Sequence, residues 1–527
     1  MKELKFEELS TEQKLGMLNT AMIGGACTPE DLEYLLDMVR NHALGSLWVQ
    51  WDQTWPDKTA VDYIKMVREV ADYPLIIMTD AESGIGEYLV GKHNAIGCTG
   101  SEKHAYAFGK VVATVARKMG YNTVCNPLLD IDTSGNVRLY GSDKYEIARL
   151  AAAEARGIHD GGLLTIAKHY PGGENPGGID SHMTESYSEQ TREELIERDL
   201  YPYRELMKED LIDGMMSEHK RFVKIDPNAP ATLSKPTLDI IRDLGFKGFI
   251  ITDALKMMGI RAKYGDTECM GLSIAAGCEF AFRCDSKTRA NQEAINECYE
   301  KGIITDERLD EAVKRVLAAQ HKVMLMESRE YEELDDEILD TFRRINKDSV
   351  YVKTDEGLTP AISRDGRHYF AVMVKNGQKI GTNGIDEDTF NASWFHTDKV
   401  LAQIRRLFPN SEIQLIYQFP DREQCQTLLQ KSVSYDDVIY LTFTEPIPYV
   451  GREHLTRRIE SQIEALQYTG KVSTLIHFGN PCVLGNLPHI PRYVLGGLSA
   501  ASVETCLEIL AGEYEPHGVL TYDVTLN

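Results

Sequence analysis

The 527-residue sequence lacks the features that would place the protein in a membrane or on nucleic acid. It contains no apolar run of about 18 residues, the length at which a segment becomes a candidate membrane span. Basic residues are few, because 57 lysines and arginines stand against 81 aspartates and glutamates. The net charge of −24 repels phosphate backbones and anionic lipids. We therefore predict no nucleic-acid partner and no membrane partner.

Metal-binding spacings and a leader segment are lacking as well. The ten cysteines form no CxxC pair, and no HExxH motif occurs. Residues 1–19 have no apolar core of the kind found in signal peptides. Scattered thiols without a signal peptide favour a reducing compartment. We expect a cytoplasmic protein with no metal and no cofactor, and the sequence leaves open whether it forms a homo-oligomer.

Eight short apolar runs alternate with helix-like stretches in the first part of the chain. The runs are continuous rather than alternating, as expected for strands buried on both faces. Most are spaced far enough apart for strand–helix–strand units, which need roughly 30 residues. The pattern predicts an α/β protein whose residues 1–325 form a (β/α)8 TIM-type barrel. The runs cover residues 21–25, 45–50, 74–80, 122–130, 163–169, 213–219, 248–253 and 278–285.

From the second run onward, each predicted strand ends on a polar residue. Because the carboxyl ends of barrel strands carry the active site, this row is a candidate site. Two of its members, Gln50 and Asp285, are interpreted as simple strand terminators. The full row is Gln50, Asp80, Asp130, His169, His219, Asp253 and Asp285.

The remainder of the chain predicts a second domain. Residues 326–360 are charged and are interpreted as a connector on the surface. Residues 361–527 resume the alternation of strands and helices, which predicts an α/β sandwich with a mainly parallel sheet. No GxGxxG or GxxxxGK[ST] motif occurs there, so we infer no nucleotide site.

Two strand ends carry side chains suited to catalysis or sugar binding. Asp253 closes the run GFIITD ahead of a helix expected to begin near Ala254. A carboxylate near a helix N-terminus stays ionised and can attack an electrophilic carbon, although an aspartate there can also simply cap the helix. Lys168 and His169 end another strand and can donate hydrogen bonds to a ligand. Alternatively, they pair with neighbouring acids in the core.

The stretch after His169, PGGENPGGIDSH, combines a loop with a possible proton carrier. Glycine and proline predict a flexible loop over the barrel mouth. Asp180 and His182 are two residues apart, so in an extended segment their side chains point the same way. Asp180 could then orient His182 as a general acid and base, although a solvated loop has the same spacing. Zinc binding by His169, His182 and His219 has no supporting spacing.

Taken together, these motifs resemble glycoside hydrolase family 3, in its β-N-acetylglucosaminidase-like branch. The branch pattern KHFPGHGDT–x–x–DSH resembles KHYPGGENPGGIDSH at 168–182. The family's nucleophile pattern GFxGxxxTDxLxMxxI resembles GFKGFIITDALKMMGI at 245–260. The stretches at 126–143 and 213–234 also resemble family segments.

The resemblance implies a retaining, exo-acting β-glycoside hydrolase, β-N-acetylhexosaminidase-like, acting on a small carbohydrate. Asp253 would form a covalent glycosyl–enzyme, and the pair of His182 and Asp180 would act as acid and then as base. The implied substrate-binding residues are Asp80, Glu82, Arg138, Lys168, His169 and His219.

The sequence also departs from the family pattern and leaves two other functions open. The family's DxEGGRVxR reads DAESGIGEYL from Asp80 onward, without the basic residues, and HGDT is replaced by GENPGG. Lys220 and Arg221 could supply the missing positive charge or select an acidic sugar. A histidine acid does not repel phosphate, so a glycoside phosphorylase of the same family is an alternative. A non-catalytic sugar-binding protein on the same fold is another.

Overall fold

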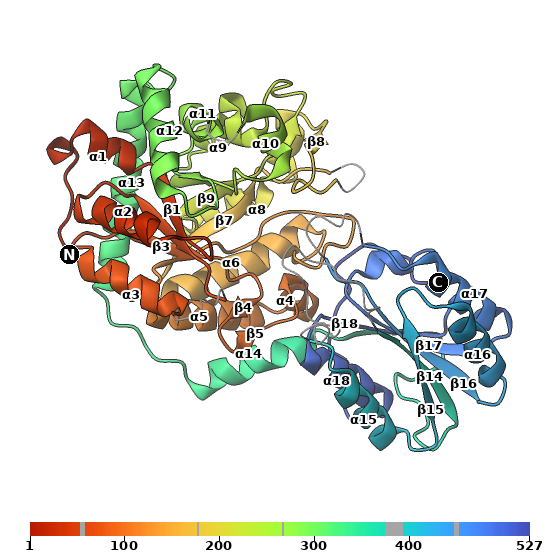
Figure 1. Ribbon diagram of the computed structural model, residues 1–527. Helices are drawn as coiled ribbons and strands as arrows, with labels where there is room; N and C mark the ends of the chain where they lie inside the picture. The colour runs from red at the N-terminus through yellow and green to blue at the C-terminus, as the bar shows by residue number, and fades with distance from the viewer. Residues whose placement is uncertain (53–57, 176–178, 266–267, 375–393, 447–452) are drawn as a thin grey trace.

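The computed structural model describes residues 1–52, 58–175, 179–265, 268–374, 394–446 and 453–527, which form two domains side by side (Figure 1). The N-terminal domain holds the larger hydrophobic core, and a separate core lies in the C-terminal domain. Two cores are expected, because a single core stops growing at roughly 250–300 residues. All ten cysteines are free thiols.

Eight parallel strands form the central sheet of the first domain, and each overlaps one of the eight apolar runs predicted as strands. Their order in the sheet is β11–β9–β7–β6–β3–β2–β1–β12. A bridge between Ile251 and Phe280 joins the two outer ends, so the sheet closes almost completely into a barrel. The predicted TIM-type barrel is confirmed. The strands are β1 (Asn19–Ile23), β2 (Ser46–Val49), β3 (Ile76–Thr79), β6 (Thr123–Val124), β7 (Leu164–Tyr170), β9 (Gly214–Ser217), β11 (Phe249–Thr252) and β12 (Ala281–Phe282).

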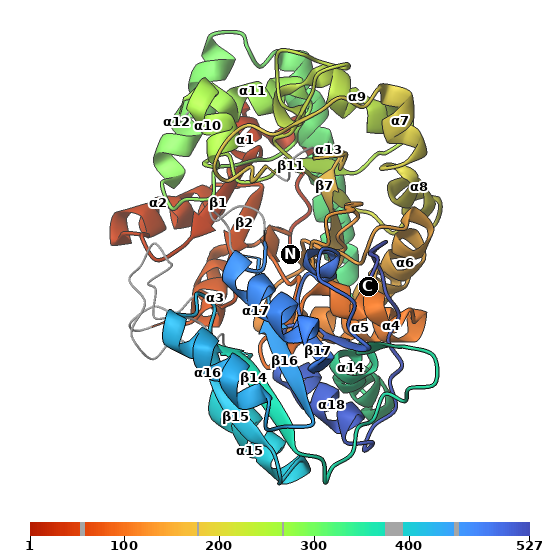
Figure 2. The same cartoon turned by 90° about the vertical axis from the view of Figure 1, so that its right-hand side faces the viewer.

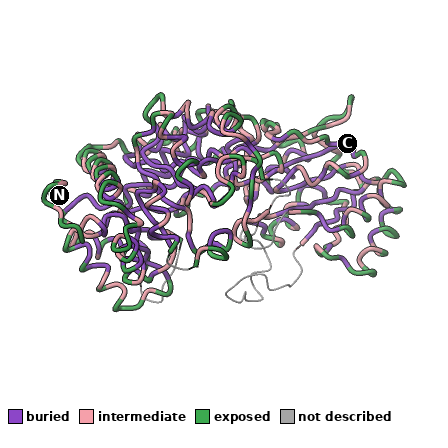
Figure 3. Tube along the Cα trace, turned by 90° about the horizontal axis from the view of Figure 1, so that it is seen from above, coloured by how far each residue is buried: buried purple, intermediate pink, exposed green. Residues whose placement is uncertain are grey.

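Helices surround the barrel and turn their apolar faces to it, so that buried residues lie inside and exposed residues outside (Figure 3). Thr28, Thr59 and Thr191 each begin a helix with a capping box, in which the threonine and an acidic residue three positions later satisfy each other's backbone N–H groups. The principal helices are α2 (Pro29–Arg40), α3 (Ala60–Val70), α4 (His93–Thr99), α5 (Glu102–Met119), α6 (Lys144–Asp160), α7 (Arg192–Glu197), α8 (Tyr201–Lys208), α9 (Lys235–Asp243), α10 (Met258–Tyr264), α11 (Glu268–Ala276), α12 (Thr288–Glu300) and α13 (Asp306–Glu327).

Six strands form the sheet of the second domain, in the order β13–β18–β17–β16–β14–β15. Every neighbouring pair is parallel except β13 with β18, so the predicted mainly parallel sheet is confirmed. Two pairs of helices cover its opposite faces, α15 with α18 and α16 with α17 (Figures 1 and 2). The elements are β13 (Tyr351–Thr354), β14 (His368–Val374), β15 (Glu412–Tyr417), β16 (Asp437–Phe443), β17 (Val472–Phe478), β18 (Arg492–Gly496), α15 (Thr397–Leu407), α16 (Arg422–Ser432), α17 (Arg457–Tyr468) and α18 (Ala500–Leu510).

Residues 326–360, predicted as a surface connector, contain two packed elements. Helix α14 (Asp336–Asp348) lies against α5 and α18 and buries Phe342 and Ile345. Strand β13 then pairs with β18 at the edge of the second sheet. The high charge of this stretch obscured a one-sided apolar pattern, because charged residues cover the outer face of α14 while its inner face joins the barrel core.

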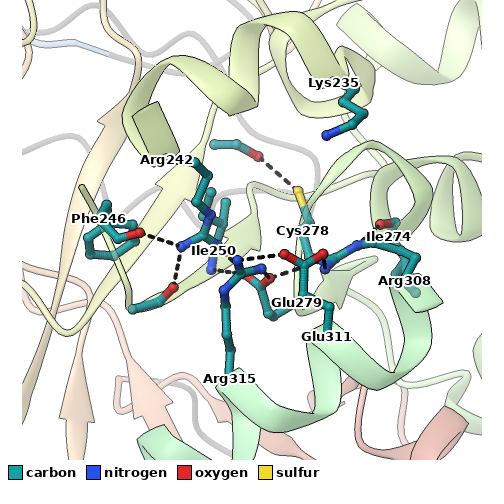
Figure 4. Close-up of polar contacts among 12 residues, drawn as sticks. Lys235, Arg242, Phe246, Ile250, Ile274, Cys278, Glu279, Arg308, Glu311 and Arg315 are labelled. Carbon is teal, nitrogen blue, oxygen red and sulfur yellow. Dashed lines mark hydrogen bonds and ion pairs between the residues drawn. The ribbon is translucent and has the colours of Figure 1, made fainter. Parts of the chain in front are cut away.

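A buried glutamate links the elements at the floor of the barrel, where β11 meets β12 (Figure 4). Glu279 is fully buried and lies 2.7 Å from Arg242, 3.0 Å from Arg308 and 2.9 Å from Arg315. Its Oε2 also accepts the backbone N–H of Ile250 at 2.7 Å. One carboxylate therefore ties α9 and α13 to the seam of the barrel.

Replacing Glu279 with glutamine is expected to lower the free energy of unfolding of the barrel by about 3 kcal/mol, because it removes the carboxylate that pairs with the partly buried Arg242 and one of the two that pair with Arg308 and Arg315. Calorimetry of the barrel transition measures the change. Glu311→Gln is the matched control, since Glu311 pairs with Arg308 and Arg315 but is exposed. Equal effects of the two substitutions would contradict the expectation.

Candidate active site

Four predicted substrate-binding residues form one charged cluster at the barrel mouth, where the carboxyl ends of the strands lie. Lys168 Nζ lies 2.5 Å from Asp80 Oδ1 and 2.6 Å from Glu82 Oε1. Arg138 donates from Nε to Glu82 Oε2 at 3.0 Å and from Nη2 to Oε1 at 2.7 Å. Strands β3, β6 and β7 are neighbours, so residues distant in sequence meet at one edge.

Asp80 and Arg138 are the members of this cluster most open to a ligand. Each side chain is 36% exposed, whereas that of Lys168 is 2% exposed. Burial raises the pKa of Glu82, but Arg138 and Lys168 outweigh burial and hold that pKa well below its usual value. Glu82 therefore stays ionised and holds the two cations. Lys168 holds the two carboxylates in position, and its contact with a sugar stays a prediction.

The second domain holds the loop that carries Arg138. The side chain of Asn480 donates from Nδ2 to the carbonyl of Ser134 at 3.0 Å. The hydroxyl of Tyr522 donates to the carbonyl of Asn136 at 2.7 Å. The second domain therefore contacts the barrel mouth by holding the loop that carries Arg138.

His169 is held by Asp130, which lies in the segment after the neighbouring strand β6. Its Nδ1 donates to Asp130 Oδ2 at 2.8 Å, and its backbone N–H bonds the same oxygen at 3.1 Å. Burial lowers the pKa of His169, but the carboxylate of Asp130 raises it above its usual value. A cationic imidazole held this way can donate a hydrogen bond to a sugar hydroxyl.

Asp253 lies at the end of β11, and its backbone N–H donates to the carbonyl of Ser217 on β9 at 2.9 Å. Burial raises the pKa of its carboxyl group, but His169 and His219 lower it below the usual value. The carboxylate therefore stays ionised, as a nucleophile must. The predicted reason was different: the helix was expected near Ala254, whereas α10 begins at Met258. Nearby histidines and the N–H of Ala254, which donates to Asp253 Oδ1 at 2.6 Å, keep Asp253 charged without a helix end.

His219 supports the segment that follows Asp253. Its Nε2 donates to the carbonyl of Ala254 at 3.1 Å, and its Nδ1 lies 3.0 Å from Thr232 Oγ1. Burial lowers its pKa below the usual value, although the Asp253 carboxylate raises it. With both nitrogens bonded and a residue exposure of 1%, His219 holds the segment after Asp253, and its contact with a sugar stays a prediction.

His182 and Asp180 form the predicted pair, although not in the predicted extended segment. His182 Nδ1 donates to Asp180 Oδ1 at 2.8 Å, and its backbone N–H donates to the same oxygen at 2.9 Å. This is an Asx-type turn, which brings a ring and a carboxylate two residues apart into contact. The carbonyls of Ser181 and His182 accept N–H groups of Gly259 and Met258, so the pair is attached to the segment that follows Asp253.

The model of the glycosyl hydrolase family 3 N-terminal domain matches residues 10–319. The chain belongs to glycosyl hydrolase family 3.

Proteins similar to this family 3 chain include two curated bacterial enzymes. A β-N-acetylglucosaminidase/β-glucosidase of Cellulomonas fimi is 28% identical over 335 residues, which are 59% of this chain and 57% of that protein. A β-hexosaminidase of Tolumonas auensis is 27% identical over 270 residues, 48% of this chain and 79% of that protein. The match to the first thus spans little more than half of its length.

Two solved structures share the fold of the whole family 3 chain. A glycoside hydrolase family 3 β-N-acetylglucosaminidase from Paenibacillus sp. superposes with a TM-score of 0.79 at 22% identity, covering 98% of this chain and 100% of that one. A β-glucoside phosphorylase superposes with a TM-score of 0.78 at 22% identity, covering 98% and 94%.

In this family 3 protein, side-chain hydrogen bonds hold the first part of the loop that leads to the Asp180–His182 pair, although its glycines and prolines predict a flexible segment. Residues 176–178 lie outside the described part, but Gly172 and Gly173 form a turn whose two carbonyls accept hydrogen bonds from Lys220 Nζ at 2.9 and 2.8 Å. Arg221 donates to Pro227 and Glu185. Lys220 and Arg221 thus both bind groups of the protein itself, and selection of an acidic sugar by either residue stays a prediction.

One residue of this family 3 site was missed from the sequence, and another was predicted without a role. Asp130 belonged to the row of candidate strand-end residues, but its contact with His169 was not predicted. Glu218 precedes His219, and nothing local distinguishes it. Its Oε2 lies 3.2 Å from Lys220 Nζ, and burial raises its pKa to about 7 even though Lys220 lowers it.

The raised pKa of Glu218 predicts how the free energy of unfolding changes with pH. With a folded-state pKa of about 7 against a usual value of 4.5, the folded state keeps a proton that the unfolded state has lost, so stability falls as pH rises through this window. Glu218→Gln removes that titration. Relative to wild type, the variant is expected to gain about 3 kcal/mol between pH 4.5 and pH 8. Thermal unfolding at both pH values tests this, with exposed Glu189→Gln as control; a parallel response of both variants would contradict it.

Among the described residues, no group of three histidines, cysteines, aspartates or glutamates is arranged to hold a metal ion. None of the described helices is both long and apolar enough to cross a bilayer. Asp285, interpreted as a strand terminator, pairs with Arg283 at 3.0 Å.

Proposed function

We propose that the protein is a retaining, exo-acting β-glycoside hydrolase of the β-N-acetylhexosaminidase type, which removes terminal β-linked sugars through a glycosyl–Asp253 intermediate. One observation carries the proposal: the pair of His182 and Asp180 is hydrogen-bonded at 2.8 Å and attached to the backbone of Met258 and Gly259, at the start of the helix that comes after Asp253. A nucleophile and a proton carrier thus belong to one connected unit at the barrel mouth.

In the first step, a carboxylate oxygen of Asp253 attacks the anomeric carbon, and the bond from that carbon to the leaving oxygen breaks. His182, protonated, gives the leaving oxygen its Nε2 proton, since Nδ1 is held by Asp180. Asp180 fixes the orientation of the ring by accepting the Nδ1 hydrogen bond. The products of this step are the free aglycone and a glycosyl ester on Asp253.

In the second step, the neutral His182 takes a proton from a water molecule whose oxygen attacks the anomeric carbon. The bond to Asp253 breaks and the carboxylate is restored. Two displacements at one carbon give net retention of configuration. Asp80 and Arg138, the most exposed members of the charged cluster, would bind the sugar together with His169, while Lys168, Glu82 and His219 would keep them and Asp253 in place.

The choice of an N-acetylhexosaminidase-type substrate is supported by the relatives, two of which bear the names β-N-acetylglucosaminidase/β-glucosidase and β-hexosaminidase. A phosphorylase is the second candidate. The observation that favours it is the acid itself: an imidazole carries no negative charge in the second step, so a phosphate anion could take the place of water without repulsion.

A screen of nitrophenyl β-glycosides, with and without a 2-acetamido group and with and without inorganic phosphate, tests both functions. Hydrolysis of the acetamido substrate, independent of phosphate, is expected. Sugar 1-phosphate as product, with turnover rising with phosphate, would replace the hydrolase by the phosphorylase. Binding of sugars without turnover in either buffer would contradict both and favour a sugar-binding protein.

A further inference from the structure

Lys220 holds the near end of the loop that carries the acid/base pair. Its ammonium group, on a residue only 6% exposed, donates to the carbonyls of Gly172 and Gly173 at 2.9 and 2.8 Å. These carbonyls converge on one ammonium because both glycines adopt positive φ, 77° and 93°. Other residues rarely adopt such values, and a Cβ on Gly173 would lie 2.6 Å from Phe222.

The N–H groups of the same turn are bound from the other side. The N–H of Gly173 donates to Asp199 Oδ1 at 3.1 Å, and that of Glu174 donates to Gln190 Oε1 at 2.6 Å. Gln190 and Asp199 are themselves hydrogen-bonded at 2.7 Å. The turn therefore has its carbonyls and its N–H groups satisfied by side chains, which defines one position for it.

From this turn, a short series of contacts leads to the acid/base pair. The side chain of Asn175 closes on Ile179 through two hydrogen bonds, from its Nδ2 to the Ile179 carbonyl at 2.8 Å and from the Ile179 N–H to its Oδ1 at 3.2 Å. Ile179 is next to Asp180, which holds His182. Hydrogen bonds and neighbouring residues thus connect Lys220 to the imidazole of His182.

We infer that Lys220 is a positioning residue for the acid/base pair, acting through the turn at Gly172–Gly173 and the closure of Asn175 on Ile179. The inference rests on the proposed function, in which His182 transfers the proton. Lys220 contacts neither Asp180 nor His182 in these hydrogen bonds, and its other charged partner is Glu218 at 3.2 Å. Through the turn, it therefore affects the steps that need a correctly placed proton donor or acceptor.

The test compares full-length Lys220→Met with wild type on two β-glycosides, one with a poor alkyl leaving group and one with dinitrophenolate. Formation of the glycosyl–enzyme needs protonation only for the first substrate. In Lys220→Met, the rate of glycosyl–enzyme formation from the alkyl glycoside should fall roughly 10- to 100-fold, the scale expected for a misplaced catalytic group. The rate from the aryl glycoside should stay within about threefold of wild type. Equal losses on both substrates, or none on either, overturn the inference.

A second measurement does not depend on activity. Hydrogen exchange at the amides of Gly173 and Glu174 is expected to be faster in Lys220→Met, and unchanged exchange there overturns the inference even if the protein proves not to be a glycosidase. Lys220→Arg should restore slow exchange and most of the alkyl-glycoside rate, because a guanidinium can also donate to two carbonyls.

The chain offers a matched control and an independent variant. Lys471→Met removes an ammonium that donates to the carbonyl of Tyr435 at 2.7 Å in the second domain, and it should change neither readout. Should Lys220→Met not fold, Asn175→Ala tests the same connection from an exposed position. It should show the same dependence on the leaving group, and a loss that is equal for both substrates would overturn the inference.

Discussion

Replacing Asp253 with asparagine is expected to lower turnover of β-glycosides by at least roughly 10⁴-fold, since the covalent step then has no nucleophile. The amide keeps the shape of the side chain, so binding of sugar should change much less than turnover. A fluorinated glycoside that traps the glycosyl–enzyme should add one sugar mass to wild type, on the peptide that contains Asp253, and none to the variant.

The control for this prediction is another aspartate at a strand end. Asp285 follows β12 and pairs with Arg283, so Asp285→Asn should retain turnover within about threefold of wild type. Label on a peptide other than the one containing Asp253, or turnover by Asp253→Asn near the wild-type level, would show that Asp253 is not the nucleophile.

Replacing His182 with glutamine is expected to separate the two steps of the reaction. With a poor leaving group, turnover should fall roughly 10²- to 10⁴-fold, the range for loss of a general acid. With dinitrophenolate, which leaves without a proton, the first step should survive and the glycosyl–enzyme should accumulate. Azide, which needs no base, should then restore turnover and release a glycosyl azide.

A second histidine–aspartate pair provides the control for His182. In the second domain, His489 Nε2 lies 2.9 Å from Asp355 Oδ2. His489→Gln should leave both substrates unaffected. If His182→Gln loses the same factor on both substrates and azide has no effect, His182 is not the acid/base residue, and another carboxyl or imidazole transfers the proton.

Much of the fold could be predicted because its signals are local. Continuous apolar runs spaced for strand–helix–strand units indicate a parallel barrel, and all eight strands lie where the runs are. The candidate nucleophile and acid/base pair were also predictable. Asp253 ends a strand, and Asp180 and His182 are close enough in sequence to meet in almost any turn.

The roles of the remaining residues depended on contacts between distant segments. Lys168 lies between Asp80 and Glu82 because β3 and β7 flank β6 in the sheet, an order that no stretch of sequence contains. His219 has both ring nitrogens bonded by residues from other segments, Thr232 and Ala254, and no local pattern predicts these contacts.

Residue types and their spacing thus specified the strands, the two cores and the candidate chemical groups, because periodicity and turn formation act over a few neighbouring residues. Which carboxylates face which cations, why Asp253 is ionised and how the second domain holds the Arg138 loop were decided by the packed chain alone. Electrostatic interactions act through space between side chains that only folding brings within a few ångströms of one another.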